Sequence, residues 1–362
     1  MYFNFKPKEK SALDAQHEAQ KIAFAPIIFQ CVRVLKEWGI LKLLYENDKS
    51  GLSHEEICQE SQKSVYSISL LLESALSADI VELKNDRYFL SKVGYFLQND
   101  PMTVSNFDFN HYVNYLGMYH LDEAMEQGKP AGLKYFGDWQ TIYPALSKLP
   151  SKVKESWFAF DHFYSDGAFE AALKILKTLN HKTVLDIGGN TGKFSLLCAK
   201  TLKDSTICVA DLPEQIESAQ INIKKALLQK QITTFAIDIL SSLPLPRGYN
   251  IVWMSQFLDC FSEEDILKIL TKVYESLEYD SRVCILEPIW DRQRLETSAF
   301  CIINTSPYFT AIANGKSRMF KWDNLKNLIE KSSLEIECVH DNLGFGHSLI
   351  ICKKIKENNG NK

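Results

Sequence analysis

The feature that most constrains the fold is an alternation of strand-like and helix-like segments in the second half of the chain. Short apolar runs of strand length are separated by stretches whose apolar residues recur at helical spacing. We expect strands at 183–188, 206–211, 232–238, 249–255, 281–288, 334–341 and 346–353. Helices are expected to begin near residues 191, 213 and 262. This alternation predicts an α/β domain with a doubly wound sheet that carries helices on both faces.

The first hundred residues have a different pattern. Residues 14–46 have helical spacing with Pro26 as an interruption, and Ser53–Glu56 has the sequence of a capping box that opens a short helix. Residues 64–81 predict a second helix, and residues 81–97 have the strand character of a hairpin. Two helices followed by a hairpin are the order of a winged helix.

Charge limits the partners of this segment and of the chain as a whole. The 362 residues carry a formal net charge of −4, and residues 51–100 hold four basic side chains against eight acidic ones. A protein that binds nucleic acid or anionic lipid needs a positively charged surface. We therefore expect a packing or dimerisation role for the winged helix, with no nucleic acid partner.

The composition indicates a globular chain with two domains. Hydrophobic residues make up 46% of it, and the N-terminus MYFNFKPKEK has no apolar leader. No apolar run is long enough to span a membrane, so we expect a cytoplasmic protein without a membrane partner. The nine cysteines include no C-x-x-C pair, which favours reduced thiols, no disulfide framework and no metal site.

Residues 105–165 are helical in tendency and rich in aromatic side chains. Two interpretations remain open: a connecting helical layer with an aromatic core, or the lining of a pocket for ring compounds. The aromatic residues are Phe107, Phe109, Tyr112, Tyr115, Tyr119, Tyr135, Trp139, Tyr143, Trp157, Phe158, Phe160, Phe163 and Tyr164.

The glycine-rich turn in VLDIGGNTGKF follows the first predicted strand of the sheet. It is not a P-loop, because Phe194 follows Lys193 and Ile187 stands where the first glycine belongs. The dinucleotide fingerprint fails as well, since Asn190 and Lys193 occupy its later glycine positions when Gly188 is taken as the first. Neither a nucleoside triphosphate nor a dinucleotide suits this turn.

An acid inside the turn indicates a cationic ligand. The carboxylate of Asp186 would repel a pyrophosphate, whereas S-adenosylmethionine has an ammonium group for it and a ribose diol for Asp211 at the end of the next strand. Glycine, and Asn190 after it, tolerate the positive φ that such a turn needs. Ligands of open sheets sit at the carboxyl ends of the strands. The candidates there are Asp186, Asp211, Asp238, Ser255 to Asp259 and Glu287.

Five short motifs in fixed order resemble one family. LDIGGNTG is similar to D-x-G-G-G-T-G, and the other four segments are ADLPEQIESA, FAIDILSSLP, QFLDCFSEEDILKIL and NGKSR. They resemble the class I S-adenosylmethionine-dependent methyltransferases, within them the two-domain O-methyltransferases of plant phenolics and bacterial secondary metabolism. The likeness covers roughly residues 158–353. It implies a Rossmann-like seven-stranded sheet with an antiparallel last strand, and a homodimer formed through the winged-helix domain.

The resemblance also implies cofactor contacts for individual residues. The turn would shape the methionine end, Asp211 and Leu212 would hold the ribose and adenine, and Asp238 and Ile239 would meet the adenine edge. Phe160 and Tyr164 match a segment that closes over the cofactor. The complete set is Phe160, Tyr164, Asp186, Gly188, Gly189, Gly192, Asp211, Leu212, Asp238, Ile239 and Ser255.

The catalytic positions depart from the family pattern. Relatives in plants use a histidine base oriented by two glutamates; here the histidine position is Asp259, the first glutamate is Glu287 and the second is replaced by Ser317. Asp259 is a candidate catalytic base, and a structural or substrate-orienting role is the alternative, because an ordinary carboxyl pKa matches a phenol poorly. His162 and His120 are further candidates for the base.

These observations predict a domain plan and a function. We expect a dimerisation domain over 1–104, a helical linker lining the substrate pocket over 105–165, a cofactor-binding methyltransferase domain over 166–355 and a disordered tail over 356–362. The predicted reaction methylates a hydroxyl of a small aromatic or polyketide-like metabolite and leaves S-adenosylhomocysteine. The alternatives are methylation of a phenolic ring carbon, and a cofactor-binding dimeric partner without transferase activity.

Overall fold

The computed structural model of the chain describes residues 8–179 and 182–355. The described chain forms two compact units that divide between Asp108 and Phe109. The predicted disordered tail at 356–362 lies outside the described residues. None of the helices in the described part of the chain combines the length and apolarity that a bilayer span requires.

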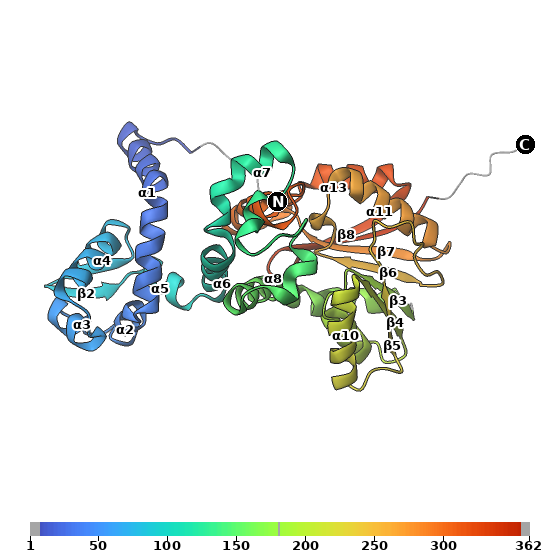
Figure 1. Ribbon diagram of the computed structural model, residues 1–362, viewed down its shortest axis with the longest axis horizontal. Helices are drawn as coiled ribbons and strands as arrows, with labels where there is room; N and C mark the ends of the chain where they lie inside the picture. Colours follow the sequence, from blue (N-terminus) through green and yellow to red (C-terminus); the bar gives the residue numbers. More distant parts are fainter. Residues whose placement is uncertain (1–7, 180–181, 356–362) are drawn as a thin grey trace, which may run out of the picture. The chain divides into compact units, whose positions relative to one another are not determined.

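The smaller unit is mostly helical, and its elements follow the predicted order (Figure 1). Ser53 opens α3 with the predicted capping box, since its Oγ accepts from the Glu56 backbone N–H and the Glu56 carboxylate accepts from the Ser53 N–H. The apolar faces of the helices share one core with the start of the hairpin. The elements are α1 (Ala12–Glu37), α2 (Ile40–Glu46), α3 (His54–Ser61), α4 (Val65–Ser77), β1 (Val81–Lys84), β2 (Arg87–Leu90), α5 (Lys92–Asn99) and α6 (Pro101–Phe109).

Helix α1 differs from the sequence prediction at one point. The expected interruption at Pro26 is wrong, because α1 continues through this residue from Ala12 to Glu37. A proline inside a helix removes one backbone donor, and the remaining hydrogen bonds of a helix of 26 residues maintain it. The first half of α1 is exposed and carries large apolar side chains. They are Leu13, Ile22, Phe24 and Ile27, between 56% and 77% exposed.

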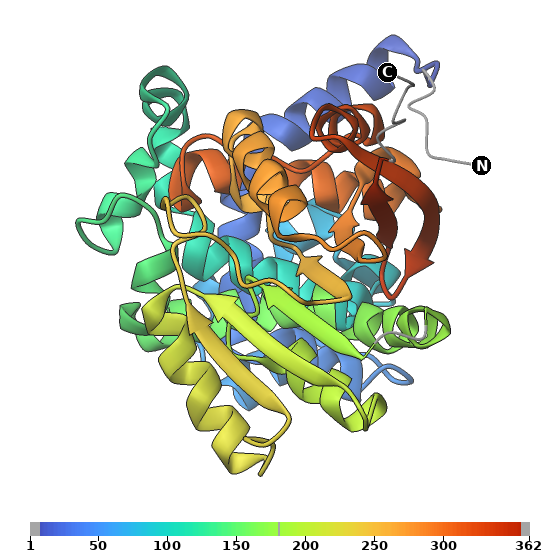
Figure 2. The ribbon, with the colours of Figure 1, turned by 90° about the vertical axis from the view of Figure 1, so that its right-hand side faces the viewer.

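The larger unit contains the predicted seven-stranded sheet, which Figure 2 shows between helices on its two faces. The strand order is β5-β4-β3-β6-β7-β9-β8, and β9 runs antiparallel to both of its neighbours. The fold class and the antiparallel last strand are therefore as predicted. The strands are β3 (Thr183–Ile187), β4 (Thr206–Asp211), β5 (Ile232–Ala236), β6 (Ile251–Ser255), β7 (Arg282–Pro288), β8 (Leu334–Leu343) and β9 (His347–Lys354).

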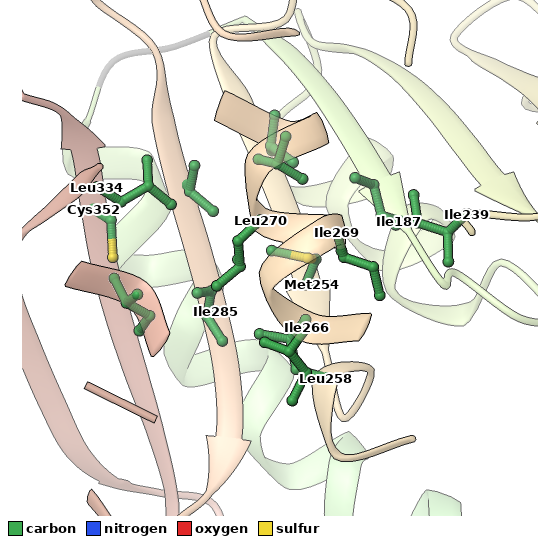
Figure 3. Packing of buried hydrophobic residues seen from close by; sticks show 14 of the residues in the cluster. Ile187, Ile239, Met254, Leu258, Ile266, Ile269, Leu270, Ile285, Leu334 and Cys352 are labelled. Carbon is green, nitrogen blue, oxygen red and sulfur yellow. The ribbon is translucent and has the colours of Figure 1, made fainter. Parts of the chain in front are cut away.

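The central strands are buried on both faces, so alternate residues enter two different cores. On β6, Met254 packs in the core under α11 and α13, whereas Trp253 packs in the core under α8, α9 and α10. Figure 3 shows Ile266, Ile269 and Leu270 of α11 over the first of these cores. The helices are α8 (Ser151–Thr178), α9 (Lys193–Thr201), α10 (Pro213–Lys225), α11 (Glu263–Ser276) and α13 (Trp322–Lys331).

A further layer of short helices belongs to the larger unit and forms its own apolar core. It contains α7 (Leu121–Gln127), η4 (Tyr143–Lys148), the start of α8, and α12 (Glu296–Tyr308), which continues into the π-helical η7 (Phe309–Ala313). Phe109 and Phe160 stack at 3.9 Å between ring centroids in this core. The layer combines residues that precede the sheet in the sequence with residues that follow β7. Residues of both groups lie at the carboxyl edge of the sheet.

Candidate functional site

The glycine turn after β3 has the backbone conformation that its sequence predicts. Gly188, Asn190 and Gly192 all have positive φ, at 72°, 50° and 80°. The turn is fixed from the next strand, because the Asn190 N–H donates to Asp211 Oδ2 at 2.7 Å. The second oxygen of Asp211 accepts from the Leu212 N–H at 2.7 Å. One carboxylate at the end of β4 therefore joins two loops at the carboxyl edge of the sheet.

The glycines of the turn leave no room for a side chain. A Cβ on Gly188 would come within 2.1 Å of Phe257 Cδ2, and a Cβ on Gly189 within 2.8 Å of Asp186 Oδ2. A Cβ on Gly192 would lie 3.6 Å from the Ala219 Cβ, which is an ordinary contact. Gly192 is the N-cap residue of α9 and has a positive φ. Backbone alone therefore forms this wall, as a closely approaching ligand requires.

Two acids of the turn region are removed from water, Asp186 almost completely and Asp211 in part. Asp186 is 2% exposed beneath the turn and accepts from Ser195 Oγ at 2.5 Å. Burial raises its pKa to about 7, and burial also raises the pKa of Asp211 to about 6 against the effect of its two backbone donors. A carboxylate removed from water favours a donor or cationic partner, so these acids suit a ligand that brings one.

A cavity of about 850 Å³ joins the turn to the aromatic layer of the same unit. It is lined by almost all of the predicted cofactor residues: Phe160, Tyr164, Asp186, Gly188, Gly189, Asp211, Leu212, Asp238, Ile239 and Ser255. Gly192 is not among the lining residues and lies behind the turn. The hydroxyl of Ser255 and the amide oxygen of Asn190 are buried with no hydrogen-bond partner among the described residues. Both fit a polar ligand in this cavity.

The other end of the cavity is aromatic. The indole N–H of Trp157 donates to the Tyr308 hydroxyl at 2.6 Å, and the Tyr143 hydroxyl accepts from Asn314 Nδ2 at 3.0 Å. Both interpretations of the aromatic stretch therefore hold in part, since these side chains form a core and also line the cavity. Tyr119, by contrast, is 84% exposed, and Phe107 packs in the smaller unit.

Asp259 lies in this cavity and Glu287 lies behind it. Asp259 is 3% exposed, lines the cavity and accepts a weak hydrogen bond from Cys260 Sγ at 3.4 Å. Glu287 is fully buried, and its Oε1 accepts from the N–H groups of Phe257 and Leu258 at 3.0 and 2.9 Å. It thereby holds the short helix η5 (Leu258–Cys260) that presents Asp259.

Burial changes the protonation of both acids. It raises the pKa of Asp259 to about 7, and the charge of Asp161 adds to this effect. Burial, with the charge of Asp259, raises the pKa of Glu287 well above its ordinary value. Glu287 is therefore a neutral anchor of the turn, and Asp259 is the acid that changes charge near neutral pH.

The remaining predicted positions have different surroundings. Ser317, which replaces the second glutamate, is buried and accepts from Asn314 Nδ2 at 2.7 Å. His162 lines the cavity, where burial and the charge of Lys193 lower its pKa. His120 does not line the cavity; its ring nitrogens contact Glu123 at 3.0 Å and Tyr135 at 3.3 Å.

The sequence analysis did not name Asp161 as a site residue, and it covered Gln256 only as part of the range Ser255 to Asp259, without a role. Asp161 lies on α8 between the predicted Phe160 and Tyr164, and Gln256 follows Ser255 at the end of β6. Gln256 has a φ of 45°, which is unusual for a residue with a long side chain. Their positions beside predicted residues were the available indication.

Comparisons with known proteins agree with this architecture. Residues 16–88 match the model of the Dimerisation2-like domain, and residues 163–331 match the model of the O-methyltransferase domain. The fold and the cavity define a class I methyltransferase. The chain belongs to the family of S-adenosylmethionine-dependent O-methyltransferases, and S-adenosylmethionine is its cofactor. The predicted family, enzyme class and cofactor are confirmed, and the alternative of a partner without transferase activity is not retained.

Similar proteins differ in the atom they methylate. The L-tyrosine C(3)-methyltransferase of Streptomyces lavendulae is 22% identical over 335 residues, which are 91% of this chain and 90% of that protein. O-methyltransferase 2 of Dictyostelium discoideum is 26% identical over 229 residues, 61% of this chain and 65% of that protein.

Solved structures show the same fold. The S-adenosylmethionine-dependent methyltransferase SibL aligns with a TM-score of 0.70 at 21% identity, over 93% of this chain and 98% of that one. The mitomycin 7-O-methyltransferase MmcR aligns with a TM-score of 0.70 at 14% identity, over 95% of this chain and 98% of that one.

We predict that Glu287 stabilises the larger unit as a neutral acceptor. Glu287→Gln keeps an oxygen for the two backbone donors, so its urea midpoint stays close to that of the wild type. Glu287→Leu leaves two buried N–H groups without an acceptor, each costing about 1–3 kcal/mol of unfolding free energy. Glu275→Leu, on the exposed face of α11, is the matched control with little effect. Equal destabilisation by Gln and Leu would contradict a neutral anchor.

Proposed function

We propose that this enzyme transfers a methyl group to a hydroxyl of a small aromatic or polyketide-like metabolite. The observation that carries the proposal is the single cavity of about 850 Å³, which is lined by the glycine turn at one end and by aromatic side chains at the other. Pockets of this size and composition suit ring compounds. The buried Asp259 lies in the same cavity, where an acceptor hydroxyl needs a proton acceptor.

The cofactor contacts that we propose follow the order of the strands. The turn with Gly188 and Gly189, above Asp186, holds the methionine end, and Gly192 shapes the turn from behind. Asp211 and Leu212 hold the ribose and adenine, since the Asp211 carboxylate retains free lone pairs beside its two backbone donors. The remaining contacts are Asp238 and Ile239 at the adenine edge, Ser255 near the cofactor, and Phe160 and Tyr164 over it.

The proposed mechanism depends on positioning and on one proton. When bound, S-adenosylmethionine supplies an electrophilic methyl group. The aromatic walls orient the acceptor ring, and in-line placement of this kind is a large part of the rate of a direct displacement. Asp259 accepts the hydroxyl proton, and its pKa of about 7 suits a base at neutral pH better than the ordinary carboxyl value. Glu287 keeps the Asp259 turn in place.

A second candidate function is methylation of a phenolic ring carbon. It is favoured by the Streptomyces lavendulae L-tyrosine C(3)-methyltransferase, which matches 91% of this chain. The replacement of the family histidine by Asp259 also favours methylation of a ring carbon. An ionised phenol has high electron density on its ring carbons as well as on oxygen, so the same carboxylate serves either reaction.

The assembly that we propose is a homodimer formed through residues 16–88. Support comes from the match to the Dimerisation2-like domain and from the exposed apolar side chains on the first half of α1. Exposed apolar surface of this kind is usual for an interface. A cytoplasmic location remains part of the proposal, supported by nine free thiols.

Methyl transfer is tested with a labelled donor. Purified protein is incubated with S-adenosylmethionine carrying ¹³C in its methyl group and a metabolite extract of the source organism, and products are examined by NMR. We expect a labelled aryl methoxy signal. A labelled aryl methyl signal would support the second candidate, and the absence of labelled product would refute both. Protein with Gly188→Val is the control, because its side chain would overlap Phe257.

We predict that Asp211→Asn weakens S-adenosylmethionine binding by roughly 10-fold to 150-fold, because hydrogen bonds to a charged group contribute about 1.5–3 kcal/mol. Isothermal calorimetry measures this without any acceptor. Asp204→Asn, an exposed change in the loop before β4, is the matched control and binds like the wild type. Unchanged affinity in Asp211→Asn would contradict the proposed ribose contact.

The homodimer is tested by light scattering. The wild type is expected at twice the 41.4 kDa chain mass at micromolar concentration. Ile22→Glu removes an apolar contact of α1 and weakens the dimer by about tenfold or more. Leu227→Glu, an equally exposed apolar position in the larger unit, leaves the mass unchanged. A wild-type monomer would refute the proposal.

A further inference from the structure

A hydrogen-bonded chain of three side chains ends in the cavity beside Asp259. His347 Nε2 contacts Gln256 Oε1 at 2.6 Å, and Gln256 Nε2 donates to Asp161 Oδ1 at 3.2 Å. His347 is 1% exposed on β9, whereas Gln256 and Asp161 both line the cavity. The chain therefore connects a buried histidine at the start of β9 to a carboxylate that lines the cavity.

The direction of the chain follows from the chemistry of its ends. An ionised carboxylate only accepts, so Gln256 presents its amide N–H to Asp161 and its oxygen to His347. Burial lowers the pKa of His347 to about 4, so the ring is neutral and its single proton lies on Nε2, facing the Gln256 oxygen. The amide cannot rotate without losing both bonds. Gln256 holds this arrangement despite its left-handed backbone, which indicates a local strain that surrounding contacts maintain.

Asp161 and Asp259 line the same cavity. The charge of Asp161 contributes to the raised pKa of Asp259, and both charges also raise the pKa of Tyr308. Asp259 is almost fully buried, and the Cys260 thiol donates to it. Two carboxylates therefore line the same cavity as the aromatic side chains and are available to an acceptor hydroxyl.

We propose that Asp161 is a second catalytic carboxylate, which shares with Asp259 the task of accepting the proton of the acceptor hydroxyl. Gln256 and His347 are its positioning residues. The inference rests on the proposed function. The hydroxyl proton passes to a carboxylate of the pair, the oxygen electron pair forms the new O–C bond, and the electron pair of the broken C–S bond stays on sulfur.

The charged and titratable neighbours of the pair come from several elements. On α8, His162 Nδ1 lies 3.9 Å from Asp161 Oδ2, and Asp166 raises the pKa of Asp161. Lys193 of α9 lowers it, and burial raises it to about 6 as the largest effect. The groups whose charge or hydrogen bonding involves Asp259 are Cys260, Tyr308 and Glu287, and Tyr143 interacts in turn with Cys260.

Carboxyl titration tests the pair without an acceptor. Protein with ¹³C at the aspartate side-chain carboxyls is titrated by NMR, and the Asp161 and Asp259 signals are assigned by their loss in Asp161→Asn and Asp259→Asn. We expect wild-type midpoints near 6 for Asp161 and near 7 for Asp259. Asp161→Asn lowers the Asp259 midpoint, because a neighbouring negative charge is gone. Gln256→Met raises the Asp161 midpoint, because the amide donor of the ionised form is gone.

A lower Asp259 midpoint in Asp161→Asn and a higher Asp161 midpoint in Gln256→Met show that Gln256 positions Asp161. A merely structural role of Gln256 would not move the Asp161 midpoint. His347→Phe is expected to act in the same direction as Gln256→Met, and Gln256→Met decides alone if the histidine variant does not fold. An Asp161 midpoint near the ordinary value of about 4, or one that Gln256→Met does not move, would overturn the proposal.

Label transfer completes the test with the same extract and methyl-labelled donor as above. Asp161→Asn is expected to slow transfer on the order of 10²-fold to 10⁴-fold, while Asp204→Asn keeps the wild-type rate. Gln256→Met moves the acidic limb of the rate profile to higher pH. A wild-type rate in Asp161→Asn would overturn the inference. No transfer by the wild type would refute the proposed function, while the titration would still decide on the pair.

Discussion

The hydrogen bond from the Asn190 N–H to the Asp211 carboxylate is the constraint on which the site depends. At 2.7 Å it ties the glycine turn after β3 to the end of β4. Without it, two loops at the carboxyl edge of the sheet would lack a common anchor. The same carboxylate receives the Leu212 N–H at the start of α10. One acid thus organises backbone that the proposed cofactor approaches, and partial removal from water raises its pKa to about 6.

A similar arrangement supports the acceptor end of the cavity. Glu287 lies on β7 and holds the turn after β6 through two backbone donors, so that Asp259 is presented into the cavity. In both places a carboxylate on one strand fixes the loop of its neighbour. Conventional packing of the two cores keeps the strands in register, and the acids then position the loops. The contacts that hold the Asp259 loop are made to backbone N–H groups, so they do not depend on the side chain at position 259.

The sequence predicted the fold and the conformation of the glycine turn well, because those features are local. Strand periodicity, the capping box at Ser53 and the left-handed positions at Gly188 and Asn190 depend on a few neighbouring residues. The chain from His347 through Gln256 to Asp161 joins three distant segments, so no local pattern contains it. The course of α1 through Pro26 was also missed, since propensity alone does not include the contacts that maintain a long helix.

The most direct measurement of the central claim is a crystal structure of the protein with S-adenosylhomocysteine. The account predicts the ribose hydroxyls within hydrogen-bond distance of the Asp211 carboxylate, the amino acid end over the turn at Gly188, and the sulfur open toward Asp259. A nucleoside bound outside the cavity, or one from which Asp211 is turned away, would contradict it.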